Sequence, residues 1–142
     1  MSRFQILLLN GPNLNLLGTR EPEVYGNSTL DDLVSDLRKR FPDIEIADVQ
    51  SNDEGALIDV IQECGSRLDV IVCTPGVYAQ TSVAIRDAVA SIPAPVIEVH
   101  ISNIHAREEF RNISIVGGAC KAVISGLGVS GYAVAIAHLK SL

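Results

Sequence analysis

Short apolar runs alternate with amphipathic helical patterns along the whole 142-residue chain, and this alternation constrains the fold more than any other feature. It is typical of strand–helix–strand units, which place parallel strands in one sheet and cover both faces with helices. Because such crossovers are right-handed, we expect a doubly wound α/β sandwich with strand order 2-1-3-4-5. The predicted strands span residues 5–9, 44–49, 69–73, 96–99 and 119–124. The predicted helices span residues 30–41, 57–64, 81–90 and 131–139. The charged stretch 103–110 is expected to be irregular or to form short helical turns.

The composition excludes several classes of protein. With 47% apolar and 20% charged residues the chain is too apolar for a disordered protein, and it lacks the run of about 18 apolar residues that a membrane span requires. Its length fits a single domain over residues 1–142. The net charge of −6 argues against nucleic acid as a partner. The one basic triplet, at 38–40, closes a predicted helix, where cations complement the helix dipole. Thr29 and Asp32 are predicted to start that helix.

The cysteines and the first apolar run bear on where the protein works. The run at 7–9 is too short for the core of a signal peptide, so we expect a cytoplasmic protein. Cys64, Cys73 and Cys120 are far apart in the sequence and form no CxxC motif. This pattern favours reduced, mostly buried thiols.

Polar side chains follow three of the predicted strands. In a doubly wound sheet, ligands bind outside the carboxyl ends of the strands, at the switch point between the first and third strands. Segment 10–27 follows the first strand and is long for a simple connection, which is typical of functional loops. Segments 74–80 and 100–103 follow the third and fourth strands. Together they predict a pocket for an oxygen-rich small molecule that can also transfer protons.

Three residues in these loops are candidates for proton transfer. A tyrosine with an ordinary pKa of about 10 is a poor base, but a nearby guanidinium favours the phenolate, so Arg20 and Tyr25 can act together. The sequence leaves open whether they are instead ordinary loop residues. His100 ends a strand beside Ser102, and the sequence leaves open whether it transfers protons or is a semi-buried structural histidine.

Other motifs argue against cofactor chemistry. There is no P-loop and no GxSxG elbow, and the GxGxxG at 126–131 follows the last strand, where a tight turn into a helix explains it. His100 and His105 have no third partner at a suitable spacing, so we predict no metal site. An FMN protein is disfavoured because segment 10–15, directly after the first strand, contains no serine or threonine. A receiver domain is disfavoured because Cys73 and Thr74 stand where it would have an aspartate. Lys121, in the last predicted strand, is expected at an edge or interface.

At this point six segments become recognisable. They closely resemble segments of the type II 3-dehydroquinate dehydratases, and the resemblance covers essentially the whole chain. The first and fourth segments are highly specific. The matching segments are 6–26, 50–52, 81–87, 98–103, 105–111 and 126–128.

The resemblance implies a lyase without cofactor or metal that converts 3-dehydroquinate to 3-dehydroshikimate. This step belongs to the shikimate pathway of aromatic amino acid biosynthesis or to quinate catabolism. The family has a flavodoxin-like fold, with helices on both faces of a five-stranded parallel sheet. The resemblance also implies a homo-oligomer, namely a dodecamer built from trimers.

The resemblance further implies a role for individual residues. Tyr25 would be the base that removes the proton next to the ketone, with Arg20 favouring its phenolate. Asn13 would hold a water that stabilises the enolate, and His100, supported by Glu98, would protonate the departing hydroxyl. The implied substrate-binding residues are Thr74, Gln80, Ile101 and Ser102 (the last two through their backbone amides), Arg111 and, from a neighbouring subunit, Asp87. Gly18 and Gly26 bracket a segment that could close over the substrate.

The chain departs from the family pattern around the substrate rather than in the proton-transfer set. Thr74 replaces an asparagine and Gln80 replaces a histidine, while Asp53, Asn112 and Ile113 stand at other positions where the family usually has histidine. Three readings follow: a dehydratase with altered affinity, a related lyase acting on a different cyclic polyol keto-acid, or a non-catalytic ligand-binding protein. We favour the first, because a protein that only binds has no need of a base.

Overall fold

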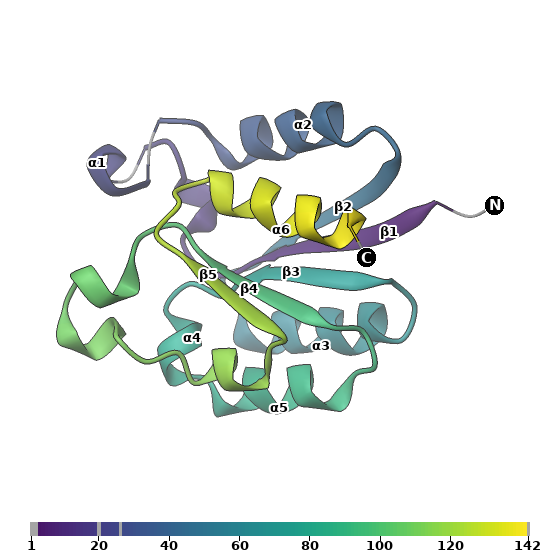
Figure 1. Cartoon of the computed structure of the whole chain (residues 1–142). Helices are drawn as coiled ribbons and strands as arrows, with labels where there is room; N and C mark the ends of the chain where they lie inside the picture. Colours follow the sequence, from purple (N-terminus) through teal and green to yellow (C-terminus); the bar gives the residue numbers. More distant parts are fainter. Residues whose placement is uncertain (1–2, 20, 26, 142) are drawn as a thin grey trace.

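The computed structural model describes residues 3–19, 21–25 and 27–141, without the side chains of Val24 and Tyr25 (Figure 1). A five-stranded parallel sheet with strand order β2-β1-β3-β4-β5 forms its centre, which confirms the predicted doubly wound, flavodoxin-like architecture. The strands are β1 (Phe4–Asn10), β2 (Ile44–Gln50), β3 (Val70–Thr74), β4 (Val96–His100) and β5 (Ala122–Ser125).

Helices cover both faces of the sheet, as predicted (Figure 1). On one face lie α2 (Leu30–Arg40) and α6 (Ser130–Lys140), and on the other lie α3 (Glu54–Gly65) and α5 (Val83–Ser91). Each face has its own apolar core. Strand β1 serves both, because Ile6 and Leu8 pack on the α2 side and Leu7 and Leu9 on the α3 side. This two-sided burial explains why its sequence is a continuous apolar run.

Side-chain caps fix where the longer helices begin. The predicted start of α2 is confirmed, because Thr29 and Asp32 form a reciprocal capping box. Asp53 caps α3 by accepting from the backbone of Ala56. The prediction of one helix over 81–90 is wrong at its start. Ser82 adopts extended backbone and its Oγ accepts from the Ile85 N–H at 2.9 Å, which separates a short helix, α4 (Tyr78–Thr81), from α5.

The last strand begins later than predicted. Ala119, its expected first residue, ends a 3-10 turn, η4 (Val116–Ala119), and the ladder with β4 starts only at Ala122. The cause is a contact with α5, because the Arg86 guanidinium donates to the Ile115 carbonyl at 2.7 Å and holds this turn against that helix. Lys121 lies immediately before this edge strand and is exposed. Four shorter elements complete the chain: η1 (Leu14–Leu16), α1 (Pro22–Tyr25), η2 (Ile104–Ala106) and η3 (Glu109–Arg111).

The loops after β1 and β3 touch at the carboxyl edge of the sheet. The Gly11 N–H donates to the Thr74 carbonyl at 2.8 Å. A Cβ on Gly11 would lie 2.3 Å from the Pro75 oxygen, so only glycine allows this approach. The glycine motif at 126–131 forms the turn between β5 and α6, as predicted.

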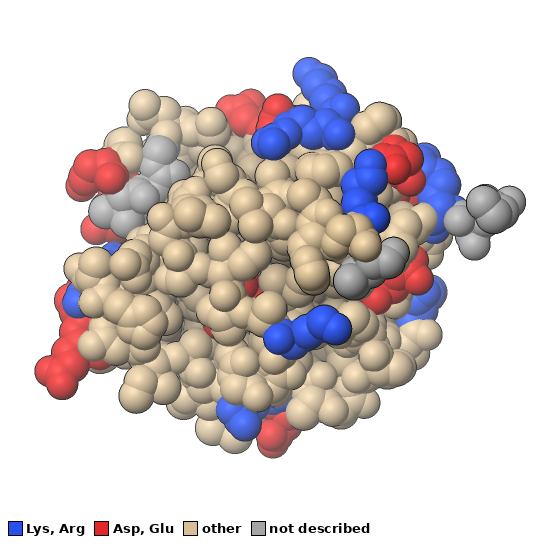
Figure 2. Space-filling model, viewed as in Figure 1, with Lys and Arg blue, Asp and Glu red and all other residues tan. Residues whose placement is uncertain are grey.

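The face in front in Figure 2, over β5 and α6, carries few charged side chains. Large apolar residues are exposed there, including Val123, Leu127 and Val134. Within the described ranges, no helix is both long and apolar enough to pass through a membrane.

Candidate active site

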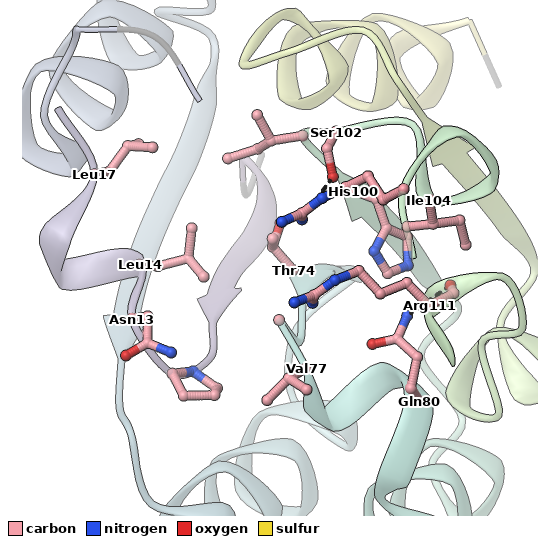
Figure 3. A pocket seen from close by; sticks show the side chains of 14 residues that line it. Asn13, Leu14, Leu17, Thr74, Val77, Gln80, His100, Ser102, Ile104 and Arg111 are labelled. Carbon is pink, nitrogen blue, oxygen red and sulfur yellow. Dashed lines mark hydrogen bonds between the residues drawn. The ribbon is translucent and has the colours of Figure 1, made fainter. Parts of the chain in front are cut away.

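A pocket opens at the carboxyl edge of the sheet, where the sequence predicted it (Figure 3). Three segments that are distant in sequence meet there: the loop after β1, the loop and short helix after β3, and the end of β4 with the segment that follows it. Apolar and polar groups share the lining. The lining residues are Pro12, Asn13, Leu14, Leu17, Thr74, Gly76, Val77, Gln80, His100, Ile101, Ser102, Ile104, Arg107 and Arg111.

His100 and Glu98 form a buried pair at the end of β4. The side chain of Glu98 is fully buried between β3 and β5, in register with Cys73 and Val123. His100 Nε2 lies 2.8 Å from Glu98 Oε2. Alternation along the strand gives residues 98 and 100 the same face, so the carboxylate can reach the ring. Among the described residues His100 Nδ1 has no hydrogen-bond partner, and this nitrogen is therefore available to a ligand.

Two arginines make one side of the pocket cationic, although the chain as a whole is acidic. Arg107 Nη1 donates to Ser102 Oγ at 3.2 Å, and another of its nitrogens lies 3.9 Å from a carboxylate oxygen of Glu21. Arg111 Nε donates to Glu108 at 2.6 Å, and this hydrogen bond lowers the pKa of the Glu108 carboxyl. The arrangement favours an anionic ligand.

Backbone groups add to this anion-binding character. The N–H groups of Ile101 and Ser102 donate to no group within the described part of the chain. Their carbonyls are already paired, with the Gly128 N–H at 2.9 Å and with Ser125 Oγ at 3.2 Å. Successive free amides beside arginine side chains are suited to a carboxylate.

A buried polar cluster lies at the base of the pocket. The Tyr132 hydroxyl of α6 donates to Asn10 Oδ1 at 2.6 Å, and Thr74 ends the neighbouring strand in register with Asn10. Burial raises the pKa of the Tyr132 phenol, and the Thr74 hydroxyl beside it reduces that effect only in part. A buried phenol with a raised pKa is a poor base, and Tyr132 does not line the pocket.

The loop that carries Asn13 is fixed by residues after β2. Asn13 has a left-handed backbone, with φ of 71°. Its N–H donates to Asn52 Oδ1 at 3.0 Å, and Gln50 Nε2 donates to the same oxygen and to the Gly11 carbonyl, each at 3.1 Å. The Tyr78 hydroxyl in turn donates to the Asn52 carbonyl at 2.8 Å. This network explains why segment 50–52 is part of the recognisable pattern.

The structure brings together most of the predicted site residues. Glu98 lies behind His100 rather than in the lining, and Asp87 is exposed on α5 and does not line the pocket of its own chain. Arg20 and Gly26 lie outside the described residues, and of Tyr25 only the backbone position in α1 is described. The predicted residues that line the pocket are Asn13, Thr74, Gln80, His100, Ile101, Ser102 and Arg111.

The remaining departures from the family pattern lie outside the lining. Asp53 serves as the N-cap of α3, and the side chain of Ile113 is 75% exposed. Asn112 is half-buried and its Oδ1 is buried without a partner among the described residues.

Arg107 was not predicted as a pocket residue. It lies in the charged segment 103–110, whose 3-10 turns and bends have no clear periodicity, so side-chain directions could not be predicted there. The one available signal was the spacing of Arg107 and Arg111 in a segment next to His100.

Comparisons with known proteins agree on one family. A sequence profile of the family described as dehydroquinase class II matches residues 4–140. The chain is 51% identical to a catabolic 3-dehydroquinase of Penicillium rubens, over 94% of this chain and 88% of that protein. It is 48% identical to 3-dehydroquinate dehydratase 1 of Agrobacterium fabrum, over 96% of each chain. A crystal structure of a type II dehydroquinase from Butyrivibrio crossotus matches with a TM-score of 0.95 and 47% identity, over 99% of each chain.

Proposed function

The chain belongs to the class II dehydroquinase family, and on that premise we propose that its pocket eliminates water from 3-dehydroquinate to give 3-dehydroshikimate. The reaction removes a proton from the carbon next to the ketone, forms an enolate and then expels hydroxide. It needs a base, an acid and a group that stabilises the enolate, all around one pocket.

The acid in this proposal is His100. Its Nε2 is held by Glu98, so that Nδ1 delivers the proton to the departing hydroxyl. The carboxylate beside the ring stabilises the protonated imidazole before the transfer. The buried His100–Glu98 pair facing a cationic pocket is the single observation that carries the proposal.

The base is Tyr25, with Arg20 favouring its phenolate. Both assignments follow from the resemblance of segment 6–26 to the family. Asn13 stands on the same loop and lines the pocket, which supports a role in holding the water that stabilises the enolate. The Tyr132 phenol is held neutral by its burial, so it does not compete for this role.

The substrate carboxylate is bound by the free amides of Ile101 and Ser102, and the ring hydroxyls by Thr74, Gln80 and Arg111. The Arg107 guanidinium adds positive charge on the carboxylate side. Because two guanidinium groups line the pocket, the free energy of binding favours an anion over the neutral analogue.

We also propose a homo-oligomer, a dodecamer built from trimers, working in the cytoplasm without cofactor or metal. The exposed apolar side chains of β5 and α6 on the face with few charges support a contact between copies. In such an assembly Asp87 reaches the ring-hydroxyl side of a neighbouring pocket. Light scattering of the purified protein tests the stoichiometry.

Turnover tests the function directly. Purified protein is mixed with 3-dehydroquinate, and the ultraviolet absorbance of the conjugated enone product is followed. We expect turnover by the wild-type protein and a loss of about 100-fold to 10,000-fold in Tyr25→Phe, the range for removing a general base. No turnover by folded wild-type protein would reject the proposal and redirect the search to other carboxylated cyclic polyols or to binding without catalysis.

A further inference from the structure

Ser114 contacts the side of Glu98 that His100 leaves free. Ser114 Oγ lies 3.0 Å from Glu98 Oε1, while His100 Nε2 lies 2.8 Å from Oε2. Ser114 stands in the loop between η3 and η4, not on the sheet. The two carboxylate oxygens therefore have one partner each, from two different parts of the fold.

The partners of Ser114 fix the direction of its hydrogen bond to Glu98. The Gly117 N–H donates to Ser114 Oγ at 2.9 Å. A carboxylate has no proton to give, so the Ser114 hydroxyl hydrogen goes to Glu98 Oε1. A Cβ on Gly117 would lie 3.0 Å from Glu98 Oε2, so a residue without a side chain at this position leaves room for the carboxylate.

We propose that Ser114 is a positioning residue for the acid: its hydroxyl fixes the rotation of the Glu98 carboxylate, which in turn holds His100 as the Nε2–H tautomer with Nδ1 directed to the substrate. Without the hydroxyl, Glu98 Oε1 is buried without a donor, and the carboxylate can turn away from the ring. Ser114 itself does not line the pocket and acts only through Glu98. The kinetic part of this inference rests on the proposed dehydration, whereas the tautomer does not.

Loss of the Ser114 hydroxyl also changes the proton affinity of the Glu98–His100 pair. The hydroxyl stabilises the pair more when the pair carries a net negative charge than when it is neutral. Removing it therefore raises the proton affinity of the pair as a whole.

The two thiols near the pair do not titrate with it near neutral pH. Burial raises the pKa of Cys73 on β3 and raises that of Cys120, after η4, to about 12, and Glu98 adds to both shifts. Two carboxylates, those of Glu108 and Glu21, lie beside arginines of the pocket. The other charged groups that the described residues place on this side are guanidinium groups, which keep their charge. They belong to Arg86 on α5 and to Arg107 and Arg111, which line the pocket.

The kinetic test compares Ser114→Ala with Ser114→Thr and with Ser91→Ala. Ser91 is the matched control, because its hydroxyl also makes one half-buried hydrogen bond, to the Ala88 carbonyl at 2.7 Å on α5. We expect Ser114→Ala to lower kcat about fivefold to tenfold, to leave KM within about twofold, and to move the alkaline limb of the kcat profile up by about half a pH unit. Ser114→Thr keeps the hydroxyl and should restore the wild-type limb.

The second measurement needs no turnover. Nitrogen-15 chemical shifts of the His100 imidazole in wild-type protein should report the Nε2–H tautomer at high pH, and the midpoint of its titration should rise in Ser114→Ala but not in Ser91→Ala. A wild-type Nδ1–H tautomer would overturn the proposal even if Ser114→Ala does not fold. So would a Ser114→Ala protein whose titration and kcat profile match those of Ser91→Ala. If wild-type protein gave the predicted tautomer but no enone, the proposed function would fail and the positioning role would stand.

Discussion

The two sides of the pocket differ in how their polar groups are satisfied. On the β4 side, Glu98 is fully buried, and both its oxygens have partners within the chain, Ser114 and His100. On the opposite rim, Gln80 is half-buried, and the one hydrogen bond of its side chain within the described residues, to the Arg111 carbonyl, is 3.3 Å long. The His100–Glu98 pair is thus set by the core of the fold, whereas Gln80 can change without disturbing that core. Of the departures from the family pattern, Gln80 lies on this rim, Thr74 lies at the base of the pocket, and Asp53, Asn112 and Ile113 lie outside the lining.

The largest expected effect comes from the β4 side. His100→Gln can still donate a hydrogen bond to Glu98, but it has no group that can deliver a proton. We expect kcat for 3-dehydroquinate to fall about 100-fold to 10,000-fold. His138→Gln, an exposed histidine on α6, is the matched control and should retain wild-type kcat. Equal kcat in the two variants would show that the acid is elsewhere.

The next effect concerns the contact between the loop after β1 and the loop after β3 at the pocket. Gly11→Ala would place a Cβ 2.3 Å from the Pro75 oxygen, which forces the two loops apart. We expect the free energy of unfolding to fall by about 2 to 3 kcal/mol, measured by urea denaturation. Gly55→Ala is the control, because its Cβ would only approach Asp53 at 3.5 Å, and in α3 alanine is favoured over glycine. An equal response of the two variants would contradict the close approach of the loops.

These two predictions show what the sequence could and could not provide. The fold followed from local patterns: β1 is apolar throughout because both its faces are buried, and the capping box of α2 was legible in Thr29 and Asp32. The pocket followed from the rule that ligands bind at the carboxyl edge of a parallel sheet.

Other features depend on contacts between distant segments. Ser114 is 16 residues from Glu98, and no periodic pattern marks it. The late start of β5 depends on the Arg86 contact with the Ile115 carbonyl, 29 residues away. The break before α5 is a local feature, because it depends on the cap that Ser82 makes to Ile85 three residues later. For Tyr25 and Arg20 the residues themselves left the role open, and the resemblance to the family decided between the alternatives.

A smaller effect is expected on the rim. Gln80→Ala should raise KM about fivefold and leave kcat within about twofold, because the proposed function gives this side chain a part in binding the substrate and none in proton transfer. Gln62→Ala, on the exposed side of α3, is the matched control for steady-state kinetics. A large fall in kcat with unchanged KM would mean that the rim is part of the catalytic machinery, and the contrast between the two sides would be lost.

The smallest effect concerns how the free energy of unfolding changes with pH, and it tests the burial of the Cys120 thiol near Glu98. Burial raises the pKa of Cys120 from its ordinary value of 9.0 to about 12. Between these values the unfolded chain has released the thiol proton and the folded chain has kept it, so stability falls as the pH rises. Cys120→Ala removes this contribution and should make the loss of unfolding free energy between pH 9 and pH 10.5 shallower, by up to about 1 kcal/mol per pH unit. Identical slopes in urea denaturation would contradict the burial of this thiol.

The most direct test of the account is a calorimetric titration of His100→Gln with 3-dehydroquinate. If His100 transfers the proton and Gln80 only binds, this variant should bind the substrate without forming the enone, and adding Gln80→Ala should weaken binding about fivefold. A folded His100→Gln protein that does not bind 3-dehydroquinate, or one whose affinity does not respond to Gln80→Ala, would contradict these separate roles of His100 and Gln80.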